Sequence, residues 1–257
     1  MRRYHSELPK SEKQALLKDY RDIKIGTPEK FFPNNRISTT KYTVYTFFFK
    51  NMFEQLSKIA NIYFVFLSIL QCIPNVTTSN GIPTYLPPLL TIMILTMIKD
   101  GYEDYKRYKS DEEENNKKTL AWRDGNFTQI QWRDVMVGDV LKVEKDNFFP
   151  ADMMIMGSSL YKKGQCFIET KNLDGETNLK SKFVIEDLKN YLQSDQQALS
   201  MIGQKINAEG PNHYLSKFKG TLELGQNKFP LSANNFLLRG CMLRNTEYIF
   251  GCVVYTG

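Results

Sequence analysis

The sequence predicts a membrane α-helical hairpin followed by a mainly-β domain, and two observations carry this prediction. Residues 59–98 contain no Asp, Glu, Lys or Arg, although charged residues make up 24% of the chain. From about residue 119 onward, short apolar runs alternate with turn-forming residues, which is typical of a sandwich or a distorted jelly-roll-like domain. The length of 257 residues is sufficient for both parts.

The uncharged window is too long for one membrane helix and long enough for two, because a span needs about 20 predominantly apolar residues. We expect spans at about 57–73 and 85–104, joined by the turn-forming stretch 74–83. Basic residues flank both spans on their outer sides and are absent from the connecting loop, so both termini are expected to be cytoplasmic. A helical hairpin buried inside a large soluble protein is the alternative, which the complete lack of charge disfavours.

Beyond the second span, residues 100–118 are rich in Lys, Glu, Tyr and Asn and predict a helix that continues as a stalk. Asp124–Gly125 is a hairpin signal between two strand candidates, 119–123 and 127–132. Further strands are expected at 140–143, 153–156, 166–169, 219–224, 235–238 and 248–255. We therefore divide the chain into a cytoplasmic N-terminal segment (1–50), a two-helix transmembrane hairpin (51–105), and a stalk extension with a β-rich domain (106–257).

Composition excludes several other classes of protein. The net charge of +6 is spread along the chain without a dense basic run, so no nucleic-acid partner is expected. The four cysteines and two histidines show no spacing typical of a zinc site or a redox pair, so we expect reduced thiols and no metal site.

The segment with the most chemical information is Asp174–Gly175–Glu176–Thr177. Asp-Gly favours a tight turn because glycine tolerates positive φ, and the turn would present Glu176 at the tip of a loop. An isolated Asp-Gly-Glu is usually an ordinary turn. Whether this segment is a functional loop or an ordinary turn depends on the motifs in the rest of the chain.

Several segments, in consistent order and spacing, give this loop a context. Val137–Gly138–Asp139–Val140, Pro150–Ala151–Asp152 and the Asp174–Thr177 loop together resemble the actuator domain of P-type ATPases. Other segments resemble the type IV branch, the phospholipid-transporting ATPases or flippases, in their N-terminal portion with the first two spans. These segments are Asn34–Asn35–Arg36–Ile37, Lys50–Asn51–Met52–Phe53–Glu54–Gln55–Leu56, Tyr102–Glu103–Asp104–Tyr105–Lys106–Arg107 and Leu243–Arg244–Asn245–Thr246.

The resemblance implies an ATP-driven flippase that phosphorylates itself on an aspartate and then hydrolyses the aspartyl-phosphate as lipid moves between leaflets. Glu176 would orient and polarise the attacking water, which requires a carboxylate within hydrogen-bond reach. Gly175 would let the backbone approach the phosphate, while Asp174 and Thr177 would shape the loop. Rotation of the actuator would then pull on the spans through the stalk.

The resemblance also implies what must be supplied from outside these residues. The family's DKTGT phosphorylation motif and a nucleotide site are not found in this sequence, so the chain alone is expected to be inactive. ATP and Mg²⁺ are implied for the complete enzyme, and no cofactor is expected within this chain. The family further implies a phospholipid substrate, a glycosylated two-span accessory subunit, and residence in a eukaryotic endomembrane or plasma membrane.

Polar residues at membrane depth mark a candidate lipid site. Asn61 and Gln71 lie within the first expected span, where polar groups are costly and often line a substrate path; hydrogen bonding to a neighbouring helix is the alternative. Aligning on Ile73–Pro74 places the glutamine pair of the family's aminophospholipid flippases at Gln71 and Cys72. Cysteine is a poor hydrogen-bonding substitute for a carboxamide, so this departure puts phosphatidylserine selectivity in doubt.

Two other functions stay open at this point. A stand-alone truncated paralogue, acting as a non-enzymatic membrane or structural subunit, would fit a chain of this length. A cation pump of the same superfamily would share the actuator features but not the hairpin segments quoted above. The flippase interpretation accounts for the largest number of segments.

Overall fold

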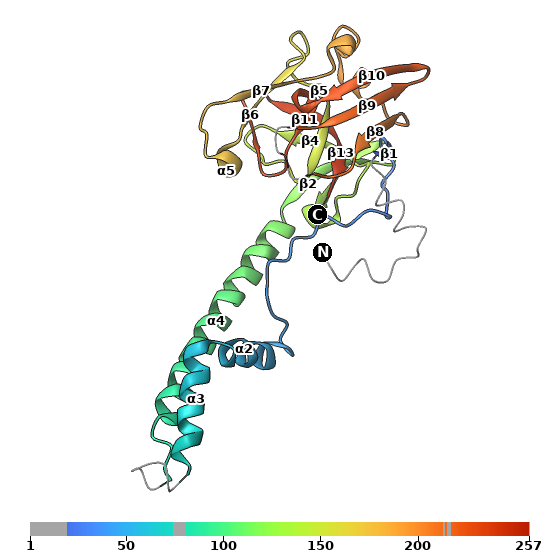
Figure 1. The fold of residues 1–257 in the computed structure, drawn as a ribbon. Coiled ribbons are helices and arrows are strands. Elements are labelled where there is room, and N and C mark those ends of the chain that lie inside the picture. The colour runs from blue at the N-terminus through green and yellow to red at the C-terminus, as the bar shows by residue number, and fades with distance from the viewer. Residues whose placement is uncertain (1–19, 74–80, 213, 215–216, 257) are drawn as a thin grey trace. The chain divides into compact units, whose positions relative to one another are not determined.

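A computed structural model describes residues 20–73, 81–212, 214 and 217–256, and the chain divides into two compact units. One unit is a β unit, made of the described residues up to Ile37 together with those from Asn115 onward. The other is a helical unit, Ser38–Glu114. Figure 1 traces both units along the chain.

The β unit contains three antiparallel sheets, which confirms the mainly-β prediction. The largest has six strands in the order β11-β5-β13-β4-β2-β3, the second has the order β1-β8-β9-β10, and the third β12-β6-β7. The strands of the six-stranded sheet are β2 (Lys118–Arg123), β3 (Asn126–Gln131), β4 (Val140–Glu144), β5 (Asp152–Ser158), β11 (Phe236–Leu237) and β13 (Tyr248–Tyr255). The other strands are β1 (Tyr20–Lys24), β6 (Gln165–Glu169), β7 (Lys180–Phe183), β8 (Lys205–Glu209), β9 (Lys219–Leu224), β10 (Asn227–Ser232) and β12 (Met242–Arg244).

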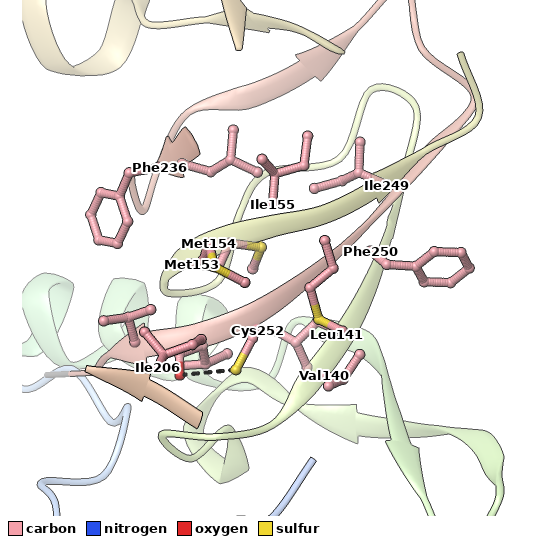
Figure 2. Packing of buried hydrophobic residues seen from close by; sticks show 14 of the residues in the cluster. Val140, Leu141, Met153, Met154, Ile155, Ile206, Phe236, Ile249, Phe250 and Cys252 are labelled. Atoms are coloured by element: carbon pink, nitrogen blue, oxygen red, sulfur yellow. Dashed lines mark hydrogen bonds between the residues drawn. The ribbon is translucent and has the colours of Figure 1, made fainter. Parts of the chain in front are cut away.

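The core lies on the paired central strands β5 and β13. Both strands are buried over nearly their whole length, which is why their sequences are continuous apolar runs instead of alternating patterns. Figure 2 shows Met153, Met154 and Cys252 among the side chains of this core. The strands approach so closely at a register shift that a Cβ on Gly251 would lie 2.6 Å from the sulfur of Met153. Glycine at this position avoids that contact, whereas any larger residue would displace Met153.

The N-terminal described residues contribute to the β unit, although the sequence pattern assigned residues 1–50 to a separate segment. Strand β1 pairs with β8, placing Ile23 opposite Ile206, and both side chains are fully buried. Gly138 then allows the chain after β1 to approach the domain, since a Cβ there would lie 2.3 Å from the carbonyl oxygen of Thr27. A chain segment from before the expected spans thus completes the second sheet.

The helical unit comprises α2 (Phe47–Leu56), α3 (Ile59–Gln71) and most of α4 (Leu86–Asn115). Helix α4 is continuous, so the expected second span and the expected stalk form one helix. Helix α3 has 13 residues and is shorter than the span expected at 57–73, while α2 was not anticipated from the sequence. Within the described residues no individual helix has the length and apolarity to span a bilayer, whereas α2 and α3 meet that criterion jointly as a pair bent by 81°.

A candidate actuator loop

The candidate loop lies between two paired strands of the three-stranded sheet. Strand β6 pairs with β7 so that Ile168 lies opposite Lys180, and the chain between them forms the loop. Arg244 of β12 secures the β6 end, because its Nε donates to Glu169 Oε2 at 2.8 Å. The sheet therefore holds both ends of the loop in place.

A short helix and a left-handed glycine give the loop its turn. Helix α5 (Lys171–Asp174) ends at Gly175, which has φ = 77° and donates its N–H to the carbonyl of Lys171 at 3.0 Å. This is the left-handed C-terminal cap that glycine adopts without a Cβ penalty. A Cβ at Gly175 would find no neighbouring atom within 4 Å, so the backbone angle, not space inside the unit, favours glycine.

The carboxylate of Asp174 organises the loop. It accepts hydrogen bonds from Thr170 Oγ1 and from the backbone N–H of Glu176, each at 2.9 Å. It also accepts a hydrogen bond from Lys180 Nζ at 2.5 Å. The ammonium group of Lys180, followed by the N–H of Glu176, lowers the pKa of Asp174 to about 2. Asp174 is thus an ionised anchor of the loop backbone.

Glu176 is more exposed than the two charged side chains beside it, Asp174 and Lys180. Its side chain is 57% exposed, and Oε2 lies 2.9 Å from Lys180 Nζ. Thr177 follows it at an exposed position. The structure therefore brings Asp174, Gly175 and Glu176 together in one turn. A carboxylate presented in this way can orient a water molecule on a group that approaches from outside the unit.

Lys180 and Thr170 are contributors that sequence reasoning did not assign. Lys180 contacts both carboxylates of the loop, and Thr170 donates to Asp174. The spacing of Glu176 and Lys180, four residues apart, was an available signal, but it usually indicates a helix pair. Here the two residues lie on a turn and on the first position of a strand, so their contact depends on the sheet pairing.

Separate motifs of the sequence meet at Asn35, which is fully buried. Its amide donates to the carbonyls of Trp132 and Pro150 at 2.8 and 3.0 Å, and Arg239 Nη1 donates to its oxygen at 3.0 Å. The backbone N–H of Arg239 also donates to Asp152 Oδ1 at 2.7 Å, and burial raises the pKa of Asp152. These residues hold the domain together instead of forming the loop.

The candidate lipid residues are not gathered into one cluster. Asn61, in the first turn of α3, donates to the backbone carbonyl of Gln55 at 2.8 Å. Gln71 is the last residue of α3, about 15 Å further along the helix axis, and it donates to Thr84 Oγ1 at 2.9 Å. Cys72 follows it directly and is exposed. The structure thus keeps Gln71 and Cys72 adjacent and separates Asn61 from them.

The described residues contain no group of three or more His, Cys, Asp or Glu side chains placed to hold a metal ion. Cys166 and Cys241 are free and buried, and burial raises the pKa of their thiols to about 12 and about 11.

Comparison with known proteins agrees with this architecture. The family model described as the P-type ATPase actuator domain matches residues 113–228, and the model described as phospholipid-translocating ATPase N-terminal matches residues 12–85. Phospholipid-transporting ATPase ID of Homo sapiens is 43% identical over 230 residues, which cover 89% of this chain and 19% of that protein. Phospholipid-transporting ATPase 10 of Arabidopsis thaliana is 44% identical over 228 residues, covering 88% of this chain and 19% of that protein.

The β unit is accordingly a P-type ATPase actuator domain. The chain belongs to the type IV, phospholipid-transporting P-type ATPases and corresponds to the N-terminal region of these relatives. It spans about a fifth of the length of the relatives that it matches.

Proposed function

We propose that this chain is the N-terminal part of an ATP-driven phospholipid flippase and that its actuator loop promotes hydrolysis of an aspartyl-phosphate held elsewhere in the complete enzyme. The observation that carries the proposal is the exposed Glu176 carboxylate on a glycine-capped turn of an actuator domain. The names of the relatives supply the substrate class, phospholipid.

In the proposed step, Glu176 accepts a hydrogen bond from a water molecule and takes its proton as the water oxygen attacks phosphorus. The bond between phosphorus and the aspartyl oxygen breaks, inorganic phosphate leaves, and the aspartate is regenerated as a carboxylate. Asp174 contributes by fixing the backbone on either side of Gly175. ATP and Mg²⁺ serve the domains that form the phosphoenzyme, and this chain alone has no hydrolytic activity.

We propose further that the helical unit is the first membrane hairpin, with both of its ends on the cytoplasmic side. The distribution of polar and apolar groups supports this placement. Asn51 and Gln55 of α2 are buried, whereas Phe49 and Phe53 of the same helix are 70% and 73% exposed. Ile59 and Leu95, on α3 and α4, are exposed as well. A unit that buries amides and exposes phenyl rings suits lipid better than water.

Within the hairpin, Gln71 and Cys72 form the proposed contact with the lipid headgroup, and Asn61 stabilises the join between α2 and α3. The resident membrane is a eukaryotic endomembrane or the plasma membrane, and a glycosylated two-span accessory subunit is the proposed partner. The competing proposal, a non-enzymatic membrane subunit, retains the same two units without any hydrolytic role for Glu176.

Replacement of Glu176 by Gln in the complete transporter tests the catalytic role. Glu176→Gln preserves the shape of the side chain and removes its ability to take a proton. We expect dephosphorylation to slow by about 10²–10⁴-fold, the usual contribution of a general base. The decay of ³²P-labelled phosphoenzyme after an unlabelled ATP chase measures this rate.

Glu186→Gln is the matched control, since Glu186 is an exposed glutamate of the same domain on the short helix Glu186–Leu188. It should decay at the wild-type rate. Unchanged decay in Glu176→Gln would remove Glu176 from the mechanism, and failure of the wild-type protein to form any phosphoenzyme would favour the non-enzymatic subunit.

A further inference from the structure

Lys180 joins the two carboxylates of the actuator loop. Its Nζ lies 2.5 Å from Asp174 Oδ2 and 2.9 Å from Glu176 Oε2. The backbone of Lys180 is held separately, because it opens β7 and pairs with Ile168, whose side chain is almost fully buried. The ammonium group therefore extends from a fixed strand to the tip of a turn.

Each carboxylate of the loop has a different set of partners. Asp174 also accepts hydrogen bonds from Thr170 and from the N–H of Glu176, so its position does not depend on Lys180 alone. For the side chain of Glu176, Lys180 is the one polar partner that we find among the described residues. Lys180 is thus the group that decides where the Glu176 carboxylate points.

We infer that Lys180 is a positioning residue that orients the Glu176 carboxylate. Its ammonium group also cancels one of the two negative charges of Asp174 and Glu176 when the loop meets an anionic phosphoryl group. This inference rests on the proposed role of Glu176. Without Lys180, Asp174 and Glu176 would approach the phosphoryl group with two uncompensated negative charges, and like charges repel at the short distances that catalysis requires. With Lys180, the cluster formed by Asp174, Glu176 and Lys180 carries a net charge of −1.

The Lys180 side chain stays protonated and positively charged. Its contacts with Asp174 and then Glu176 raise its pKa, so the ammonium form persists through the physiological range. The ion pairs are too exposed to hold the fold together, since Lys180 is 40% and Glu176 57% exposed. Removal of the lysine should therefore leave a folded domain, so a change in rate can be attributed to the loop.

Three variants of the complete transporter test the inference. Lys180→Met keeps the hydrocarbon stem and removes the charge, Lys180→Arg keeps the charge, and Lys228→Met removes a similarly short, exposed ion pair, with Glu223 at 2.7 Å, from β10. Phosphoenzyme decay is measured for each at low and at high salt. We expect Lys180→Met to slow decay about tenfold, less than loss of the base itself, and Lys180→Arg and Lys228→Met to remain near wild type.

Salt dependence separates electrostatic positioning from a purely structural effect. Raising ionic strength shortens the Debye length from about 30 Å at 0.01 M to about 10 Å at 0.1 M. Because salt screens the repulsion left in Lys180→Met, its decay should recover toward wild type as salt is added. A deficit that neither salt nor Lys180→Arg relieves would overturn the inference.

The sign of the effect is also decisive. Faster decay in Lys180→Met would mean that the lysine holds Glu176 back from reacting. Unchanged decay would mean that the lysine neither positions nor restrains Glu176. Both outcomes contradict the inference. Glu176→Gln, assayed in parallel, keeps the two hypotheses apart. If Glu176→Gln arrests decay while Lys180→Met does not alter it, only the role of Lys180 fails. If Glu176→Gln has no effect, the proposed function itself fails.

Discussion

The β unit and the helical unit differ in which side chains they bury and which they expose. The β unit buries Met153, Phe250 and other apolar side chains in a continuous core. The helical unit buries the amides of Asn51 and Gln55 and exposes Phe49 and Phe53. Burial in the β unit thus follows hydrophobicity for most side chains, whereas in the helical unit hydrogen-bonded amides are buried while phenyl rings lie at the surface.

The buried amides of the helical unit form a connected network. Asn51 Nδ2 donates to Asp100 Oδ2 at 2.8 Å, and Gln55 Nε2 donates to Asn51 Oδ1 at 2.6 Å. Asn61 donates in turn to the carbonyl of Gln55. These bonds join α2 to α4 and to the start of α3. In an apolar environment such polar contacts are the directional interactions available for fixing helices to one another.

The largest expected difference between the units concerns phenylalanine. Phe250→Ala in the β unit removes a side chain that is 1% exposed, so it should cost about 3–5 kcal/mol of unfolding free energy. Phe53→Ala in α2 removes one that is 73% exposed and should cost less than about 0.5 kcal/mol. Thermal unfolding of the chain in mild detergent, followed by tryptophan fluorescence and far-ultraviolet circular dichroism, measures both.

Both tryptophans, Trp122 and Trp132, lie in the β unit, so their fluorescence reports on that unit, while circular dichroism also reports on the helices. A comparable loss of stability in the two variants would contradict the contrast. It would mean that the ring of Phe53 packs against protein.

The sequence predicted the β unit best where local patterns are strong. The Asp124–Gly125 turn and the apolar runs of β5 and β13 are visible without any knowledge of the fold. Strand β1 was not found, because its partner β8 is about 180 residues away and its own apolar content is low. Strand β7 was missed for a similar reason, since a four-residue strand beginning with lysine has little pattern of its own.

The candidate loop was located from the sequence, but its internal contacts were not. Asp174–Gly175–Glu176 predicts a turn because of glycine, and Gly175 does adopt positive φ. The role of Lys180 depends on the pairing of β6 with β7, which no local sequence pattern predicts. In the helical unit, the absence of charge identified the apolar window. The bend between α2 and α3 has no glycine or proline to signal it.

A second, smaller difference concerns buried polar groups and their response to pH. Asp139 is fully buried in the β unit, with Arg123 Nη2 2.9 Å from its Oδ2 and the N–H of Met136 donating at 2.8 Å. Burial raises the pKa of Asp139, and Arg123 works against that rise. Arg123→Met should therefore cost about 2–3 kcal/mol near neutral pH, somewhat below the range for a fully buried pair because Met136 remains as a partner.

The sign of the pH dependence follows from linkage. Loss of Arg123 raises the folded-state pKa of Asp139 further above its unfolded value. A carboxyl group with a raised folded pKa supports the fold most when protonated, and that support is lost as pH rises through the folded pKa. The deficit of Arg123→Met should thus shrink as the pH is lowered from neutral, and a deficit that grows would contradict this account.

Gln55→Met is the counterpart in the helical unit. It leaves Asn51 Oδ1 without its donor at 2.6 Å and should cost about 1–2 kcal/mol. Since neither amide titrates, this loss should stay constant over the pH range in which the Arg123→Met deficit changes. A pH-dependent loss would instead implicate Asp100, the carboxylate at the end of the same network.

The smallest expected effect on stability, and the most specific on function, concerns Cys72 at the end of α3. Cys72 is exposed and its Sγ lies 3.4 Å from the carbonyl oxygen of Ser68 one turn earlier, so Cys72→Gln should change the free energy of unfolding by less than about 0.5 kcal/mol.

The new carboxamide at position 72 would lie beside Gln71 and add both a donor and an acceptor for a lipid headgroup. We therefore expect phosphatidylserine to stimulate ATP hydrolysis by the complete transporter more strongly in Cys72→Gln than in wild type, by roughly tenfold in apparent affinity if one charge-assisted hydrogen bond is gained. Cys72→Ser, which is small and polar, controls for the loss of sulfur alone. An unchanged lipid preference in Cys72→Gln would show that the headgroup is selected elsewhere, and the exposed end of α3 would then serve only to contact the bilayer.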